Sequence, residues 1–357
     1  MVNSFDKKGL LFSIRALLIV TLLFVGAKYL PDYVFNNSYL KDSLVSNSEK
    51  AIWAQQMTAS IISARESVLG YNPQEIKIGF VGDIMLDRGV LYMINKYGGG
   101  DYSFIFENIK DDLLQYDFLV GNLEGPVSDK GYDGQDLYSF RMDPQIIDLL
   151  KGLNFKVLSV ANNHINNWRE TAMEDTFNRL SSAGVLYPGG GMNEDEAYSA
   201  KTFDIKDTKI AFLSFSEFGK GDYEAVGSGS GIAVISEEKL KKSIDLAREN
   251  ADLVIVMFHF GTEYQTEQNS YQEKYAKLAV DFGADLVVGT HPHVIQNLEK
   301  YKNTYIAYSL GNFVFDQYFS EETMVGGLFE VYILDKKIDN VSLKTIKLNK
   351  SYQPDLI

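Results

Sequence analysis

The sequence predicts an α/β layered domain, and three observations lead to this prediction. From Ile76 onward, short apolar runs rich in Val, Ile and Phe are followed by polar clusters and then by stretches with helical periodicity. The apolar runs are continuous rather than alternating, which is typical of strands covered on both faces. The chain has 357 residues, 45% of them hydrophobic, which is enough for one large domain with a buried sheet.

Each predicted element follows from a local pattern. Predicted strands are Ile76–Gly82, Phe118–Gly121, Phe155–Ala161, Lys209–Phe215, Leu253–Phe258, Leu286–Gly289 and Tyr305–Leu310. Predicted helices are Phe104–Leu114, Pro144–Leu153, Glu170–Ala183, Glu237–Asn250 and Tyr271–Phe282, of which the second has Asp143 as its N-cap and proline at its first position. The tail Gly327–Leu348 alternates like two antiparallel strands, with a turn expected near Asp339 and Asn340.

The N-terminal part indicates export. Residues 9–30 form an apolar stretch close to the roughly 20 residues that cross a bilayer, and Lys7 and Lys8 precede it. We therefore expect residues 1–8 in the cytoplasm, residues 9–30 as a single-pass membrane anchor, and the bulk of the chain outside the cell membrane. A cleaved signal segment is the alternative, because Val25-Gly26-Ala27 would suit a signal peptidase. Residues 31–75 are interpreted as a stalk and residues 76–350 as the folded domain.

The composition excludes several functions. A formal net charge of −14 without a basic stripe argues against nucleic acid as a partner, because its phosphates would be repelled. The chain has no cysteine, which excludes disulfides, thiolate metal sites and cysteine nucleophiles. Any metal must be held by histidine, carboxylate and amide groups.

All four histidines follow predicted strands directly, and polar clusters follow two further strands. In open α/β sheets the carboxyl ends of the strands border the ligand crevice, so these clusters should converge. The residues concerned are Asp83, Asn122, Glu124, Asn163, His164, His259, His291 and His293. This mixture of oxygen and nitrogen donors suits Mn, Fe or Zn, and it could hold two divalent ions.

Six motifs, in order, carry a resemblance to a known family. They are GD-x-M-x-x-R, N-L-E-G, A-N-N-H, H-x-G-x-E-Y, G-x-H-P-H-V-x-Q and S-L-G-N-F-x-F-D. They resemble the CapA-type bacterial capsule synthesis family, also described as poly-γ-glutamate biosynthesis proteins, over about residues 76–330. That family is related to calcineurin-like metallophosphoesterases, which implies a four-layered α/β/β/α sandwich with metals at one end of the sheets.

The resemblance assigns roles residue by residue. Asp83 resembles the acidic ligand of the first strand, Asn163 the amide ligand, and His164 the phosphate-facing histidine that follows it. His259 resembles a lone histidine ligand, and His291 and His293 resemble the paired ligands of a Gly-His-x-His turn. Two positions depart from the superfamily pattern. Asn122 stands where an aspartate is usual, so a charged bridging ligand must be Glu124 or be missing, and Met85 stands where the first strand usually has a histidine.

Structural roles are open for the same residues. Asp83 could cap a turn, Asn163 could form a loop, and a lone His259 could be a core histidine. Arg141, Asn122 and Glu263 are predicted to contact an anionic substrate, with Arg141 preferred over Arg88, although surface salt bridges would explain both arginines. Asn312 and Asp316 are expected to shape the site from the last strand.

Together with these patterns, the resemblance implies a membrane-anchored, extracytoplasmic protein of capsule or poly-γ-glutamate biosynthesis with a phosphoesterase-like, metal-dependent hydrolase site. His164 would stabilise or protonate the leaving group. The alternative is a non-catalytic subunit that binds metal or polymer within a membrane polymer synthase or exporter. In both cases the expected partners are the cytoplasmic membrane, synthase or export subunits, and an anionic surface polymer or its precursor.

Overall fold

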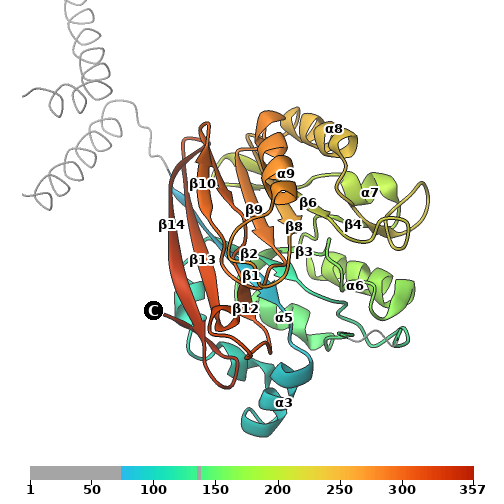
Figure 1. The fold of residues 1–357 in the computed structure, drawn as a ribbon, viewed down its shortest axis with the longest axis vertical. Helices are drawn as coiled ribbons and strands as arrows, with labels where there is room; N and C mark the ends of the chain where they lie inside the picture. Colours follow the sequence, from blue (N-terminus) through green and yellow to red (C-terminus); the bar gives the residue numbers. More distant parts are fainter. Residues whose placement is uncertain (1–73, 135–137) are drawn as a thin grey trace, which may run out of the picture. The chain divides into compact units, whose positions relative to one another are not determined.

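The computed structural model describes residues 74–134 and 138–357, and these residues form an α/β domain with two large sheets (Figure 1). The predicted membrane segment at residues 9–30 and nearly all of the predicted stalk at 31–75 lie outside the described residues. Among the described residues, no helix is long and apolar enough to cross a membrane.

The first sheet contains seven strands, in the order β15-β14-β13-β1-β2-β3, and β12 also pairs with β1. Strands β1, β2, β3 and β12 run parallel, whereas β13, β14 and β15 are antiparallel to their neighbours. The bounds are β1 Ile76–Ile84, β2 Phe118–Leu123, β3 Phe155–Ser159, β12 Asn312–Val314, β13 Val325–Leu334, β14 Lys337–Leu348 and β15 Pro354–Leu356.

The second sheet has six strands, in the order β10-β11-β9-β8-β6-β5. Its four central strands are parallel, and antiparallel hairpins close both edges. The bounds are β5 Lys201–Ile205, β6 Thr208–Ser216, β8 Leu253–His259, β9 Leu286–Thr290, β10 Leu298–Tyr301 and β11 Thr304–Ala307. A separate pair joins β4 Gly190–Gly191 to β7 Gly231–Ile232.

Three apolar clusters show how these elements stack. One cluster lies between the two sheets and contains inward-facing residues such as Ile78, Phe80, Ile255 and Val288. A second lies between the first sheet and its helices, and a third lies between the second sheet and its helices. The predicted α/β class is confirmed, and the layers run helix, sheet, sheet, helix.

Helices on the two outer sides belong to different sheets, as Figure 1 shows. The second sheet is covered by α8 Glu237–Arg248 and α9 Ser270–Asp281. The first sheet is covered by α3 Arg88–Tyr97, η1 Tyr102–Phe106, α4 Lys110–Leu113, α5 Gln145–Gly152 and α6 Arg169–Ala183. Two short helices, α7 Glu194–Tyr198 and η2 Glu322–Met324, lie in connections.

Several expectations need correction. The single helix predicted at Phe104–Leu114 is two short helices, η1 and α4, and α3 was not predicted. The turn expected near Asp339 and Asn340 is wrong, because the chain reverses at Asp335 and Lys336, which have φ values of 51° and 62°. Two consecutive residues with positive φ match the right-handed twist of a tight hairpin, and this geometry does not require glycine.

A close contact with a later segment of the chain fixes the position of the carboxyl end of β1. A Cβ atom at Gly82 would lie 1.8 Å from the carbonyl oxygen of Gly311, so only glycine allows this approach. The next residue, Asp83, donates its backbone N–H to the same carbonyl at 3.0 Å. The carboxyl end of β1 is therefore held against the segment that leads into β12.

Candidate metal centre

The carboxyl ends of five parallel strands deliver the predicted site residues to one place. Asp83 lies in β1, Asn122 lies in β2 with Glu124 directly after it, and His164 follows β3. In the other sheet His259 ends β8, and His291 and His293 follow β9. The hydrogen bonds and ion pairs described below join these side chains across both sheets, so the predicted convergence of the clusters is observed.

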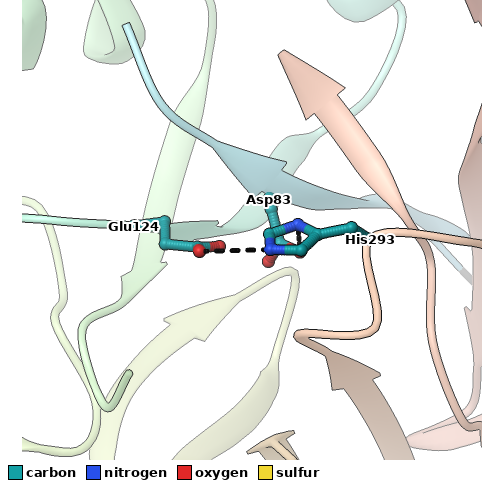
Figure 2. A group of neighbouring side chains, drawn as sticks. All are labelled: Asp83, Glu124 and His293. Carbon is teal, nitrogen blue, oxygen red and sulfur yellow. Dashed lines mark ion pairs between the residues drawn. The ribbon is translucent and has the colours of Figure 1, made fainter. Parts of the chain in front are cut away.

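The first group of donors is Asp83, Glu124 and His293, whose candidate ligand atoms all lie within 4.8 Å of one another (Figure 2). The distance from Nδ1 of His293 to Oδ2 of Asp83 is 3.3 Å, and Nε2 of His293 lies 3.7 Å from Oε1 of Glu124. All three residues are buried. Oε1 of Glu124 has no hydrogen-bond partner among the described residues. A buried carboxylate oxygen without a partner is costly, which indicates that a cation or donor belongs there.

The second group is Asn163, His259 and His291. Nε2 of His259 lies 2.8 Å from Oδ1 of Asn163 and 3.2 Å from Nδ1 of His291. Asp83 lies between the groups, since its Oδ2 also faces the backbone N–H of His291 at 3.4 Å. Donor atoms of one ion with bonds of about 2.0–2.2 Å lie roughly 3–3.5 Å apart. The 2.8 and 3.2 Å contacts of the second group are close to this spacing, and the first group is wider.

Asn122 lies at the centre and acts as a hydrogen-bond donor. Its Nδ2 lies 2.8 Å from Oδ1 of Asp83 and 3.3 Å from Oε2 of Glu124. The side chain of Asn162 fixes the orientation of this amide. Nδ2 of Asn162 donates to the backbone oxygen of Leu123 at 2.8 Å, and the same Nδ2 lies 3.2 Å from Asn122. The Asn122 atom that faces this donor is therefore Oδ1, and its Nδ2 points to the carboxylates. Asn122 is fully buried and is engaged with these partners.

His164 has a defined tautomer. The backbone N–H of Phe140 donates to Oδ1 of Asn167 at 3.1 Å, so this amide atom must be the oxygen. Nδ1 of His164 lies 2.9 Å from the same oxygen and therefore carries a hydrogen. In the neutral ring, Nε2 is then a proton acceptor, and it lies 3.7 Å from Oε1 of Glu124.

Burial and neighbouring charges set the ionisation of the candidate donors. Burial, followed by the charge of Asp83, raises the pKa of Glu124 well above its ordinary value. Burial opposes ionisation of Asp83 as well, but hydrogen bonding and charge from His293 outweigh it, and the pKa of Asp83 is lowered. Burial lowers the pKa of His259 well below its ordinary value and that of His291 to about 3. These two histidines are neutral at pH 7, as metal ligands must be.

Further residues orient the ligands, and sequence patterns identified only some of them. Nδ1 of His293 lies 2.9 Å from Oδ1 of Asn312, as expected for a residue that shapes the site. Thr290 faces Nδ1 of His259 at 3.0 Å and was not predicted, although its place beside His291 in the motif could have indicated it. Phe218 packs 4.4 Å from the ring of His291, and no sequence signal points to it.

The predicted substrate contacts have different surroundings. The guanidinium of Arg141 stacks on Trp168 at 3.6 Å. Glu263 is half-buried, and its charge adds to the raised pKa of Glu124, so it lies near the centre. Asp316 pairs with Arg88 rather than joining either donor group.

The chain is similar to a known protein family and to several known proteins. The family model described as "Bacterial capsule synthesis protein PGA_cap" matches residues 77–317. A capsule biosynthesis protein CapA from Bacillus anthracis is 33% identical over 276 residues, which cover 75% of this chain and 65% of that protein. A PGA biosynthesis protein CapA from Bacillus subtilis is 32% identical over 250 residues, which cover 69% of this chain and 65% of that protein.

The chain therefore spans about 65% of the length of these two relatives. A solved structure described as a novel phosphatase from Mycoplasma pneumoniae aligns with a TM-score of 0.47 and 16% identity, over 77% of this chain and 94% of that chain.

Proposed function

Because the chain belongs to the bacterial capsule synthesis protein family PGA_cap, we propose that it takes part in assembling a poly-γ-glutamate type of surface polymer. The names of the two Bacillus relatives, a capsule biosynthesis protein and a PGA biosynthesis protein, support this role. The proposal places the domain outside the cytoplasmic membrane, on a single span at residues 9–30, beside membrane-bound synthase or export subunits. An N-terminal tag that stays with the membrane after a carbonate wash would support the anchor, and its absence from mature protein would contradict it.

The proposal also assigns a metal-dependent hydrolase of the phosphoesterase type to the buried centre. The observation that supports it best is the unpartnered oxygen of Glu124 between the imidazoles of His164 and His293. One ion would be held by Asp83, Glu124 and His293, and a second by Asn163, His259 and His291. Divalent Mn, Fe or Zn bound there would acidify a water molecule and neutralise charge on a phosphoryl oxygen.

His164 is the residue proposed to move the proton. Its side chain is 12% exposed, whereas that of His293 is 2% exposed and His259 and His291 are buried as well. Burial lowers the pKa of His164 to about 4, so its Nε2 is free to accept a proton at pH 7. It can take a proton from the attacking water and return it to the leaving oxygen.

The first test is hydrolysis of an aryl phosphoester by the Mn-loaded full chain. We expect phenolate release that depends on metal content. The variant His164→Asn should lower kcat by about 100-fold or more while metal content stays the same. Full metal occupancy without any turnover would rule out a phosphoesterase.

A non-catalytic role is the second candidate, and Asn122 favours it. This residue donates an N–H to Asp83 where a bridging ligand would be an acceptor. Replacing His291 and His293 with Ala in cells separates the two roles. Loss of surface polymer with an intact partner complex supports catalysis, whereas unchanged polymer supports a scaffold.

A further inference from the structure

Arg88 has an unusual backbone conformation beside the proposed metal centre. It begins α3 with a φ of 52°, which is in the left-handed region that non-glycine residues rarely adopt. Asp87 holds this conformation, because its carboxylate accepts the N–H of Arg88 and the N–H of Arg141, both at 2.8 Å. A strained residue that is held by its neighbours is a reason to look for a function.

The guanidinium of Arg88 is fixed on one edge and free on the other. Its Nε donates to Oδ2 of Asp316 at 3.2 Å, and its Nη2 lies 3.1 Å from Oδ1. Asp316 is itself anchored, because it accepts the backbone N–H of Gly89 at 2.9 Å. Among the described residues no hydrogen bond reaches Nη1 of Arg88, and the side chain is 35% exposed. The group is a rigid cation with an open donor edge.

This cation lies one aromatic ring away from His164. The guanidinium is 5.1 Å from the ring centre of Phe140, and Phe140 packs on the ring of His164 at 4.2 Å. Burial is the main cause of the low pKa of His164, and the positive charge of Arg88 adds to it. Tyr138, which is exposed, lies 5.9 Å from the guanidinium and borders the same place.

We propose that the open edge of Arg88 is an anion subsite that binds a carboxylate of the substrate, next to the group that reacts at the metal centre. The proposal rests on the function proposed above, because a γ-linked glutamate polymer carries a free carboxylate on each residue. The planar guanidinium matches a planar carboxylate better than an ammonium does. A fixed cation is also what an anionic substrate needs on a protein with a net charge of −14.

The test measures binding of a γ-linked triglutamate peptide to the metal-loaded full chain by calorimetry. The neutral probe is a γ-linked peptide of the same length in which the free α-carboxylates are converted to amides. We expect Arg88→Gln to weaken triglutamate binding by about 10- to 100-fold, and Arg88→Lys to weaken it by less, because lysine keeps the charge but loses the fork. Binding of the neutral peptide should not change.

The matched control is Arg179→Gln. Arg179 also pairs with a buried aspartate, Asp175, at 2.6 Å, and its side chain is 31% exposed. We expect this variant to bind triglutamate like the unaltered chain. If Arg88→Gln does not fold, the affinity of Arg88→Lys for triglutamate tests the proposal instead, since lysine can keep the ion pair with Asp316.

The proposal is overturned if folded Arg88 variants bind triglutamate as tightly as the unaltered chain does. It is also overturned if the unaltered chain binds both peptides equally. Turnover of the aryl phosphoester by the unaltered chain is measured in parallel. Turnover without a binding preference for triglutamate would contradict the anion subsite and leave the proposed hydrolase standing. A preference for triglutamate that depends on Arg88, without turnover, would contradict the hydrolase and leave the subsite standing.

Discussion

At the residue scale, Asn122 is a neutral amide among the charged side chains of the centre. It lies beside two carboxyl groups, of which one, Glu124, has a raised pKa because it is buried next to the charge of Asp83. A neutral amide here lets Asp83 ionise without a third negative neighbour. The same choice leaves Asp83 to supply the charged oxygen between the two donor groups.

The variant Asn122→Asp tests how this amide affects the stability of the metal-free protein and the affinity for metal. The shape of the side chain is unchanged, but a carboxylate now faces Asp83 and Glu124, so the metal-free protein should lose about 1–3 kcal/mol of unfolding free energy. Affinity for Mn should rise, because the new carboxylate is an additional ligand. Chemical denaturation in EDTA and titration with Mn measure the two effects. Unchanged stability together with unchanged affinity would show that the residue does not lie between the ions.

Sequence patterns identified most of the donor set at the residue scale. Histidines that directly follow apolar runs, and the paired His291 and His293, were visible as motifs. The sequence pattern does not predict the direction in which each side chain points. His291 and His293 have φ values of 99° and 60°, and the turn that Pro292 makes between them points the two rings into different donor groups. The preference for Arg141 over Arg88 rests on the segment from Gly131 to Gly134, which resembles a loop over a site. The strain at Arg88 is a property of the backbone and leaves no trace in composition.

At the scale of elements, the end of β1 is the most sensitive contact. Gly82 touches the carbonyl of Gly311, and this contact sets the position of Asp83 relative to β12. The end of β1 and the segment before β12 cannot move apart without breaking the hydrogen bond from the N–H of Asp83 to the carbonyl of Gly311.

The variant Gly82→Ala should therefore destabilise the fold by at least about 1–3 kcal/mol, since the added methyl group meets backbone rather than a flexible side chain. The control is Gly152→Ala at the end of α5, where no heavy atom lies within 4 Å of the added Cβ. That change should be neutral or stabilising by up to about 1 kcal/mol. Thermal unfolding of the two variants measures the difference, and equal melting temperatures would contradict the role of the close approach.

Strands were predicted better than the short helices, for a physical reason. A buried parallel strand is marked by its own apolar run, as at Leu253–Phe258, whose strand ends one residue later at His259. The region Phe104–Leu114 has enough apolar residues for one helix, but it forms a 3-10 turn and a four-residue helix because its side chains pack individually into the core. Such tertiary packing overrides local periodicity.

At the scale of the whole domain, Glu330 joins several elements through one carboxylate. It lies in β13 and accepts hydrogen bonds from Tyr116 and from Ser342, with Lys77 and Lys344 paired to it at 3.1 and 2.9 Å. Burial alone would raise its pKa, but these partners outweigh burial and lower the pKa of Glu330 to about 2.

A lowered pKa in the folded state stabilises the domain above the ordinary pKa of about 4.5, and this stabilisation is lost as the pH falls towards 2. The variant Glu330→Gln should lose about 1–3 kcal/mol at pH 7, and its deficit should shrink as the pH approaches 2. Urea unfolding at pH 7 and pH 3 measures the change, with the exposed Glu238→Gln as a control. A deficit that is the same at both pH values would exclude the charge as its origin.

The donors of the centre are spread along the chain, from Asp83 near the start of the domain to His293 near its end. A growing polypeptide therefore carries an incomplete set of the proposed donors until His293 has emerged. A divalent ion, as proposed for this centre, would be captured late, after the two sheets have met, and would fasten them to each other. A chain cut short before residue 291 would lack His291 and His293, and with them one donor from each of the two groups.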